Sequence, residues 1–289
     1  MDEREALGLL GAALPAAGDD AAIVGSTAIT TDMLHASTDF PAGTTRYTAG
    51  WRSVAASLSD LAAMGAAPTA AVAAYADETF VDRDLEAFVE GACDVCETVG
   101  ADYVGGDLDT HCEFTVTTTA IGEATAPVYR SGATPGDRLC VTGTLGRSAA
   151  ALRLFDRGET DRANGLFRFP PRVEAGRRLA GVGTAMMDSS DGLARSLHQL
   201  AEASDCGFAV DREAVPIDTS VDAVTDDPAD RWAAGVQFGE DFELVCTLPA
   251  DQLAAVEADL SVPLTPIGHV TDEGVRVDGE PLADRGYTH

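Results

Sequence analysis

The sequence contains no lysine. All 19 basic residues of the 289-residue chain are arginines, and they stand against 48 aspartates and glutamates, which gives a formal net charge of −29 at pH 7. So few cations cannot form a broad basic surface, and we expect no nucleic-acid partner. The absence of lysine also excludes a Walker A phosphate loop, because its GxxxxGK pattern requires one.

Long apolar runs are lacking as well. No stretch approaches the roughly 20 consecutive apolar residues that a membrane-spanning helix requires. The first residues, MDERE, show neither the basic nor the apolar segment of a secretory signal. We therefore expect a cytoplasmic protein in a reducing compartment, with no membrane partner.

The strong acidity does not indicate disorder, since 45% of the residues are hydrophobic and can form real cores. A surface rich in carboxylates stays hydrated when salt screens its self-repulsion. This composition predicts a folded protein from a high-salt cell. The length allows one large domain or two ordinary ones.

Six cysteines are scattered along the chain. Cys93 and Cys96 form a CxxC pair, and His111 and Cys112 follow, so a zinc site is one interpretation. The alternative is that these thiols belong to a core, because apolar residues between positions 85 and 99 recur at helical spacing and include Cys96. That spacing favours the second interpretation.

Helix-like and strand-like segments alternate in both halves, which predicts an α/β or α+β fold. Helices are expected over residues 4–13, 46–64, 82–99 and 193–204, and strands over 21–24, 26–37, 70–76, 101–109 and 114–124. The segments 264–271 and 274–282 are expected to close the chain as a hairpin-like pair. A Gly- and Pro-containing loop at 131–137 separates the halves, so we expect domains over residues 1–130 and 131–289.

The stretch 186–204, MMDSSDGLARSLHQLAEAS, predicts a strand end, a tight turn and a helix. Asp188 and Asp191 lie in the turn. Free N–H groups at a helix N-terminus favour anions, and carboxylates there can instead hold a hard cation that binds a phosphate. The alternative is a plain helix cap, which needs no other purpose.

Acidic residues recur where strands are expected to end or helices to begin. They are Asp19, Asp20, Asp32, Asp60, Asp107, Asp188 and Asp191. Asp60 lies inside an apolar helix, where a carboxylate is costly to bury without a partner. Acids without His or Cys suit Mg²⁺, and in a chain without lysine the neutralisation of a polyphosphate falls to metal ions, Arg130 and backbone N–H groups. We therefore predict a multi-magnesium phosphoryl-transfer site; the alternative is that an acidic protein places acids at turns by chance.

Seven motifs resemble the thiamine-monophosphate kinase family in their order and spacing. They are TTDML (30–34), SLSDLAAMGAAP (57–68), GGD (105–107), RSGATPGD (130–137), VTGTLGRSAA (141–150), DSSDGL (188–193) and GEDFEL (239–244). This family belongs to the superfamily of aminoimidazole ribonucleotide synthetase and selenophosphate synthetase. The resemblance implies ATP as co-substrate, several magnesium ions, thiamine monophosphate as acceptor and thiamine diphosphate as product. It also implies a two-domain protomer whose N-terminal strands pair across a homodimer.

The resemblance also implies roles for residues at matching motif positions. The implied magnesium ligands, either directly or through the backbone, are Asp20, Thr30, Thr31, Asp32, Asp60, Asp107 and Asp188, with a further ion at Asp191. The implied ATP contacts are Gly106, Asp107, Arg130 and Ser190. Glu240 is the implied contact to thiamine monophosphate.

This chain departs from the family pattern at the substrate end. Many members carry His at the position of Asp39, and Phe238 replaces the first Gly of a GGED motif. An aromatic residue near the C-terminus often stacks on the substrate; here Asp284 aligns with it and Tyr287 is close by. Asp39 and Tyr287 are therefore the candidates for contacts to thiamine.

The expected mechanism needs no general base. The acceptor phosphate has a second pKa of about 6, so it is largely dianionic at neutral pH and can attack as it stands. Two other functions remain open at this point. One is another ATP-dependent member of the superfamily, such as aminoimidazole ribonucleotide synthetase, and the other is a non-catalytic metal- or nucleotide-binding protein.

Overall fold

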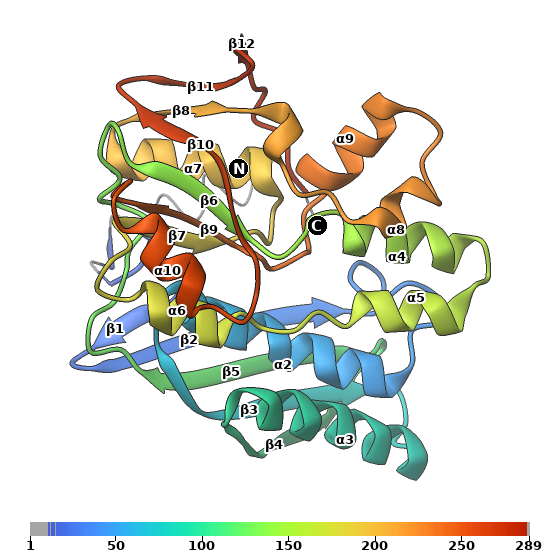
Figure 1. Ribbon diagram of the computed structural model, residues 1–289. Coiled ribbons are helices and arrows are strands. Elements are labelled where there is room, and N and C mark those ends of the chain that lie inside the picture. The colour runs from blue at the N-terminus through green and yellow to red at the C-terminus, as the bar shows by residue number, and fades with distance from the viewer. Residues whose placement is uncertain (1–10, 12, 15, 288–289) are drawn as a thin grey trace.

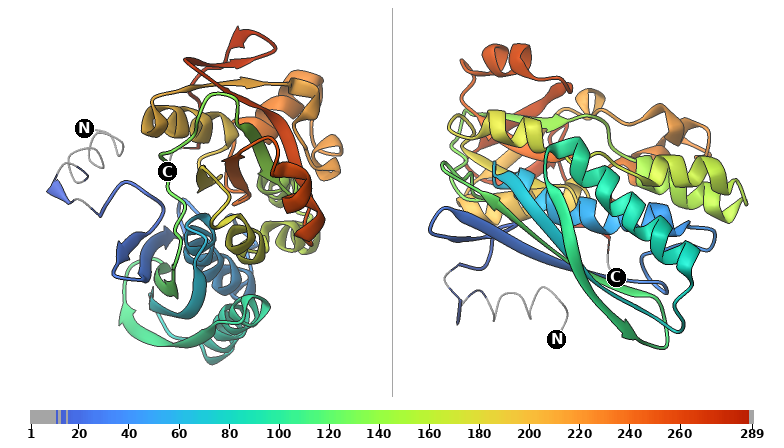
Figure 2. Two further views of the ribbon diagram at one scale, coloured as in Figure 1. Left: turned by 60° about the vertical axis from the view of Figure 1, so that its left-hand side comes forward. Right: turned by 90° about the horizontal axis from the view of Figure 1, so that it is seen from below.

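Two β-sheets, each with its own helices, form two lobes (Figures 1 and 2). The computed structural model describes residues 11, 13–14 and 16–287, so the helix expected over residues 4–13 lies largely outside the described residues. The first sheet ends at residue 123 and the second begins at residue 138. The boundary predicted at residue 130 falls within the segment that links them. Within the described residues, no helix is long and apolar enough to cross a membrane.

The first sheet has five strands in the order β1-β2-β5-β3-β4. These are β1 (Ala22–Val24), β2 (Thr27–His35), β3 (Ala67–Asp77), β4 (Asp102–Thr110) and β5 (Thr115–Glu123). Strands β3 and β4 are parallel, because helix α3 (Asp82–Val99) crosses between them, and the other neighbours are antiparallel. Helix α2 (Arg46–Ala63) packs with α3 on one face of this sheet (Figure 1).

Side chains alternate along β2 as a half-covered sheet requires. Ala28, Thr30 and Leu34 are buried toward α2, whereas Ile29 and Met33 on the other face are 41% and 60% exposed. Val72 of β3 and Ile121 of β5 are also exposed. The face of the sheet away from α2 therefore presents apolar side chains that the described chain does not cover.

Helices α2 and α3 approach each other closely at two glycines. A Cβ atom added to Gly50 would lie 2.1 Å from the carbonyl oxygen of Phe88, and one added to Gly91 would lie 2.1 Å from that of Tyr47. Neither contact leaves room for a methyl group. The short distance between the helices holds α2, which carries much of the site, firmly on the sheet.

The second sheet has seven strands in the order β12-β11-β8-β10-β6-β9-β7. These are β6 (Arg138–Thr142), β7 (Ala185–Asp188), β8 (Gly207–Val210), β9 (Leu244–Leu248), β10 (Leu264–Thr271), β11 (Gly274–Val277) and β12 (Glu280–Pro281). Its helices are α4 (Arg147–Asp156), α5 (Thr160–Phe167), α6 (Val173–Leu179), α7 (Leu193–Ser204), α8 (Thr219–Asp222), α9 (Pro228–Val236) and α10 (Leu253–Asp259). Helix α7 packs on one face of the sheet, and α6 and α10 pack on the other.

The two lobes meet where α6 packs on the C-terminal part of α2 (Figure 1). A Cβ atom added to Gly176 of α6 would lie 2.0 Å from the carbonyl oxygen of Ala62. Ala62 and Ala63 also join the core cluster that contains Val173 and Leu179 of α6. Helix α2 is thus packed against both lobes.

One expectation from the sequence is corrected here. The closing hairpin was wrong, because β8 lies between β10 and β11: β10 is already paired with β6 and β8, so β11 adds in parallel to the free edge of β8. The strand expected over 101–109, with Asp107 near its end, is β4, which runs through Gly105 and Gly106 to Thr110. Cys96 is buried, as the core interpretation predicts, whereas Cys93 is exposed, and all six thiols are free.

The close approach of α2 and α3 gives a prediction for stability. Gly91→Ala should lower the free energy of unfolding by about 1–3 kcal/mol, because the added methyl group forces two backbones apart. Urea unfolding at fixed salt measures this change. Gly165→Ala is the matched control, since nothing lies within 4 Å of its added Cβ atom and helix propensity alone favours Ala. Equal stability of the two variants would contradict the packing described.

Candidate active site

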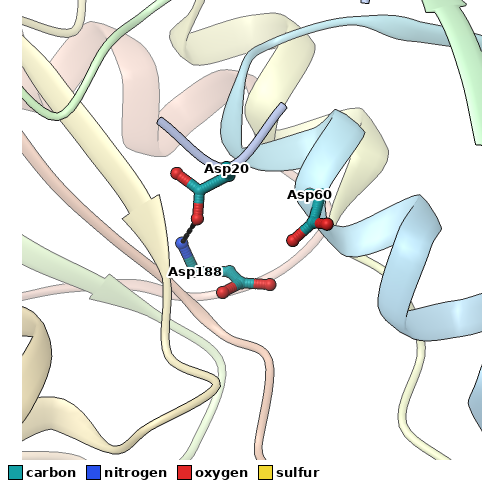
Figure 3. A group of neighbouring side chains, drawn as sticks. All are labelled: Asp20, Asp60 and Asp188. Atoms are coloured by element: carbon teal, nitrogen blue, oxygen red, sulfur yellow. Dashed lines mark hydrogen bonds between the residues drawn. The ribbon is translucent and has the colours of Figure 1, made fainter. Parts of the chain in front are cut away.

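Three carboxylates from distant parts of the chain converge where the lobes meet (Figure 3). Asp20 lies in the turn before β1, Asp60 in the last turn of α2, and Asp188 at the end of β7. One oxygen of each lies within 4.8 Å of the others, which makes this trio the candidate metal site among the described residues. Two of its members come from the first lobe and one from the second.

Small hydroxyl groups fix two of these carboxylates. The Thr30 hydroxyl of β2 donates a hydrogen bond to Asp60 Oδ2 at 2.5 Å, and the Ser59 hydroxyl of α2 donates to Asp188 Oδ2 at 2.6 Å. Two adjacent residues of α2 thus contribute to the trio. Ser59 orients Asp188, and Asp60 is itself a member. A hydroxyl can orient a carboxylate without adding charge, so the trio keeps its demand for a cation.

Arg130 is the cation that contacts the trio. Its guanidinium donates to both carboxylate oxygens of Asp20, with Nη2–Oδ1 at 3.0 Å and Nε–Oδ2 at 3.2 Å. Its backbone N–H donates to Asp19 Oδ1 at 2.8 Å. This single guanidinium is outnumbered by the carboxylates at the junction.

A fourth carboxylate, Asp32, lies close enough to affect the trio electrostatically. It accepts a hydrogen bond from the Ser57 hydroxyl at 2.5 Å. Burial raises its pKa to about 6, although the bond from Ser57 lowers it. Asp32 in turn helps to raise the pKa values of Asp60 and Asp188.

The pKa values of Asp60 and Asp188 show how costly adjacent buried acids are. Burial, followed by the neighbouring carboxylates, raises the pKa of Asp60 well above its usual value. Burial and the charge of Asp20 raise the pKa of Asp188 to about 8, against the opposing effects of Ser59 and Arg130. A bound cation would favour the ionised forms of Asp60 and Asp188. A cluster of hard oxygens without His or Cys fits Mg²⁺.

The remaining implied metal and ATP residues do not all join this cluster. Thr31 is exposed on the opposite face of β2, where its hydroxyl donates to the Thr118 carbonyl oxygen at 2.8 Å. Gly106 and Asp107 lie on the edge strand β4, which β5 and β3 separate from β2. Three strand spacings amount to about 14 Å, so Asp107 is remote from Asp32 in the same chain.

The expected positions of some acids also need correction. Asp32 and Asp107 lie inside strands rather than at strand ends. Asp60 lies inside α2, within the helix expected over residues 46–64, although in its last turn and not at a helix start. Asp60 is placed there by the small residues of α2, which let the helix pack closely while its polar side turns to the site. Asp191 and Ser190 lie in the turn after β7, as predicted.

A second group of predicted residues gathers beside the turn that holds Ser190 and Asp191. The Tyr287 N–H donates to the Asp191 carbonyl oxygen at 3.0 Å, and its hydroxyl donates to the Thr38 carbonyl oxygen at 3.3 Å. The ring centroids of Tyr287 and Phe238 are 5.3 Å apart. Phe238, one of the departures from the family pattern, is thus in contact with Tyr287.

Asp39 and Glu240 belong to the same neighbourhood. Burial raises the pKa of Tyr287, and the charges of Glu240 and Asp39 raise it further. Asp39 is buried and accepts hydrogen bonds from the His35 N–H and the Thr38 hydroxyl, both at 2.7 Å. The three residues predicted to contact the substrate, Asp39, Glu240 and Tyr287, therefore lie near one another.

The loop that carries Glu240 is held in an unusual backbone conformation. Glu240 and Phe242 have φ angles of 62° and 53°, in the left-handed region that side chains seldom adopt. The Glu240 N–H donates to the Ser190 carbonyl oxygen at 2.6 Å. Asp241 caps helix α4 by accepting from the N–H groups of Gly146 and Ser148.

Two residues that contribute to the site were not predicted from the sequence. Ser59 holds Asp188, and Arg52 donates to Glu240 Oε2 at 2.6 Å with a side chain that is 1% exposed. The available signal was an arginine inside a helix made of small and apolar residues. Such a charge is buried only with a partner, and the sequence did not indicate which one.

Profiles of two domains match most of the chain. The AIR synthase related protein N-terminal domain matches residues 18–124, and the corresponding C-terminal domain matches residues 134–279. The two lobes and the acidic junction between them are therefore those of an AIR synthase related protein. A thiamine-monophosphate kinase of Halobacterium salinarum is 62% identical over 291 residues, which cover 100% of both chains. This chain belongs to the thiamine-monophosphate kinase family.

Solved structures agree with this assignment. The thiamine-monophosphate kinase of Stenotrophomonas maltophilia has a TM-score of 0.83 and 33% identity, covering 92% of this chain and 90% of its own. A structure described as AaThiL complexed with AMPPCP and TMP has a TM-score of 0.88 and 26% identity, covering 100% of this chain and 97% of its own. The mixed α/β fold of two lobes is thus confirmed.

The raised pKa values predict a pH dependence of stability. Asp32 and Asp188 bind protons in the folded protein at pH values where the unfolded chain has lost them, so stability falls as pH rises from about 4 through 6 to 8. Asp32 alone contributes on the order of 3 kcal/mol to this loss. Urea unfolding at fixed salt, in the presence of a chelator, measures the slope.

Added Mg²⁺ should restore stability at pH 8 more than at pH 5, because it binds the ionised carboxylates. Asp188→Asn should reduce both the slope and the effect of Mg²⁺. A wild-type protein whose stability is the same at pH 5 and pH 8 without metal would contradict the electrostatics described.

Proposed function

We propose that this protein transfers the γ-phosphoryl group of ATP to the phosphate of thiamine monophosphate, giving thiamine diphosphate and ADP with the help of magnesium ions. The observation that carries the proposal is the convergence of Asp20, Asp60 and Asp188 from both lobes within 4.8 Å. Family membership supplies the reaction, and this trio supplies the means to hold two phosphate-bearing molecules together. Because the reaction consumes ATP, we expect it to take place in the cytoplasm.

The metal ligands proposed here are acids and a hydroxyl. Asp20, Asp60 and Asp188 would hold magnesium directly, and Thr30 and Asp32 line the same region. Bound magnesium would neutralise the phosphate oxygens and help align donor with acceptor. The hydroxyls of Ser57 and Ser59 keep the carboxylates oriented before any ligand arrives. Asp191, in the neighbouring turn, remains the candidate for a further ion.

The chain's own residues position the reacting phosphates. Arg130, beside Asp20, would contact ATP phosphates, and Ser190 would contact ATP from the turn after β7. An oxygen of the acceptor phosphate attacks the γ-phosphorus of ATP, and the bond from that phosphorus to the β-phosphate oxygen breaks, which releases ADP. The acceptor is largely dianionic above pH of about 6, so no side chain has to remove a proton.

The region around Glu240, Asp39 and Tyr287 is proposed to hold the heterocycles of thiamine. The thiazolium ring is a cation, and two carboxylates lie in this region. The rings of Phe238 and Tyr287 offer aromatic surface for an additional contact. In this chain Asp39 and Phe238 would replace the contacts that many relatives make with other residues.

Asp60→Asn and Asp188→Asn test the metal role. Each keeps the size of the side chain and removes its charge, so turnover should fall by about 100-fold or more while the fold remains intact. ADP release in high potassium chloride, with and without thiamine monophosphate and Mg²⁺, measures this. Asp272→Asn, an exposed acid between β10 and β11, is the control and should match the wild type. Wild-type rates in Asp60→Asn or Asp188→Asn would reject their metal role, and ADP release that does not need thiamine monophosphate would reject the proposed function.

We further propose that the protein acts as a homodimer in which each subunit completes its partner's site. Asp107 and Gly106 are implied ligand contacts, yet they lie about 14 Å from Asp32 across the sheet. The exposed apolar face formed by Ile29, Met33 and their neighbours is a surface that a second copy would cover. Such pairing would bring one subunit's Asp107 to the other subunit's carboxylates.

Mixing two inactive variants tests this arrangement. Asp60→Asn and Asp107→Asn should each be inactive alone, but a mixed dimer regains one site in which both residues are intact. Equal amounts after subunit exchange should therefore recover about a quarter of wild-type activity, since about half of the dimers are mixed and each has one working site. Light scattering should give twice the 29.9 kDa chain mass. No recovery after verified exchange would place Asp107 in its own subunit's site or outside any site.

A further inference from the structure

Arg52 is a buried cation in the middle of helix α2. Its side chain is 1% exposed, so the guanidinium has left water almost completely. Burial of a charge is costly unless it is paired and hydrogen-bonded. Its contacts therefore indicate which part of the molecule it holds in place.

The partners of Arg52 lie in the second lobe. Its Nη2 atom donates to Glu240 Oε2 at 2.6 Å and to the Glu240 carbonyl oxygen at 3.0 Å. Its Nη1 atom donates to the Phe167 carbonyl oxygen at 2.7 Å. A helix of the first lobe thus holds both the side chain and the backbone of Glu240.

Aromatic rings lie close to the guanidinium. Its central carbon lies 3.7 Å from the ring centroid of Phe167, 5.2 Å from that of Phe169 and 5.6 Å from that of Phe242. Phe169 and Phe242 are themselves stacked, with centroids 4.2 Å apart. Lys does not substitute for Arg at such a site, because its ammonium group lacks the planar, forked set of donors that the guanidinium places among these rings.

The loop that contains Glu240, which Arg52 contacts, needs contacts from its surroundings to keep its conformation. Glu240 and Phe242 both have left-handed φ angles, which are unfavourable for residues with side chains and persist only where the surroundings impose them. The Ser148 hydroxyl donates to the same Glu240 carbonyl oxygen at 2.6 Å. Arg52 supplies the remaining bond to that carbonyl and the ion pair to the carboxylate.

We propose that Arg52 is a positioning residue for the acceptor, because it fixes the side chain and the backbone of Glu240 at the region shared with Asp39 and Tyr287. This inference rests on the proposed function. The hydrogen bonds of Arg52 go to Glu240, to the Phe167 carbonyl oxygen and, at 3.4 Å, to the Ser148 hydroxyl, and none of these residues is proposed to bind ATP or metal. Loss of the fork should therefore weaken recognition of thiamine monophosphate and leave the handling of ATP unchanged.

Arg52→Lys tests the proposal, since it keeps the charge and removes the planar fork. The KM for thiamine monophosphate should rise by about 10-fold or more, whereas the KM for ATP should stay within about twofold. The thermal shift caused by thiamine monophosphate with Mg²⁺, without ATP, should shrink in parallel. Phe167→Leu, which removes the ring beside the guanidinium, should raise the same KM by a smaller factor. Arg153→Lys, which breaks a bidentate pair with Asp230, is the control and should change neither KM.

A double-mutant cycle separates positioning from a general structural role. In a Glu240→Gln background, Arg52→Lys should add little further change to the KM for thiamine monophosphate, because its effect passes through that carboxylate. Equal changes in both KM values, additive effects of the two substitutions, or wild-type behaviour of Arg52→Lys would each overturn the proposal. A wild-type protein that releases no ADP with thiamine monophosphate would instead overturn the proposed function.

Discussion

The repulsion among Asp20, Asp60 and Asp188 is the constraint around which this molecule is organised. Burial makes the repulsion stronger, and it raises the pKa of Asp188 to about 8. Three acids this close together do not stabilise the fold, so the residues packed around them must hold them in position. Hydroxyl donors, one guanidinium and two docked lobes together provide that packing. The result is a site that is ready for a cation and for the phosphates that a cation binds.

Helix α2 carries residues that contribute to both parts of the site, the acidic cluster and the region around Glu240. Asp60 faces the acidic junction, and Arg52, about two turns earlier, faces Glu240 in the other lobe. Ser57 and Ser59 orient further carboxylates. The small residues of this helix allow close packing on α3 and α6, so that polar side chains at selected positions can be held accurately. The close packing of α2 therefore both stabilises the helix and holds the side chains of the site in position.

The sequence was informative wherever the signal was local. Helical spacing located α3 at 82–99, and the pattern around residues 186–204 located β7, its turn and α7. Asp20, Asp60 and Asp188 were also singled out before their convergence was known. Contacts across the chain could not be derived in this way, because Ser59 and Asp188 are 129 residues apart. The order of strands was equally non-local, which is why the closing hairpin was wrong and the edge position of Asp107 was missed.

The contact between α6 and α2 has a consequence for the spacing of the two lobes. With Gly176 against the Ala62 carbonyl oxygen, the lobes touch backbone to backbone only two residues from Asp60. Backbones packed this closely cannot approach further, and any side chain larger than a hydrogen atom at position 176 would push them apart. The separation between Asp60 on α2 and Asp188 in the second lobe is therefore set in part by the absence of one methyl group.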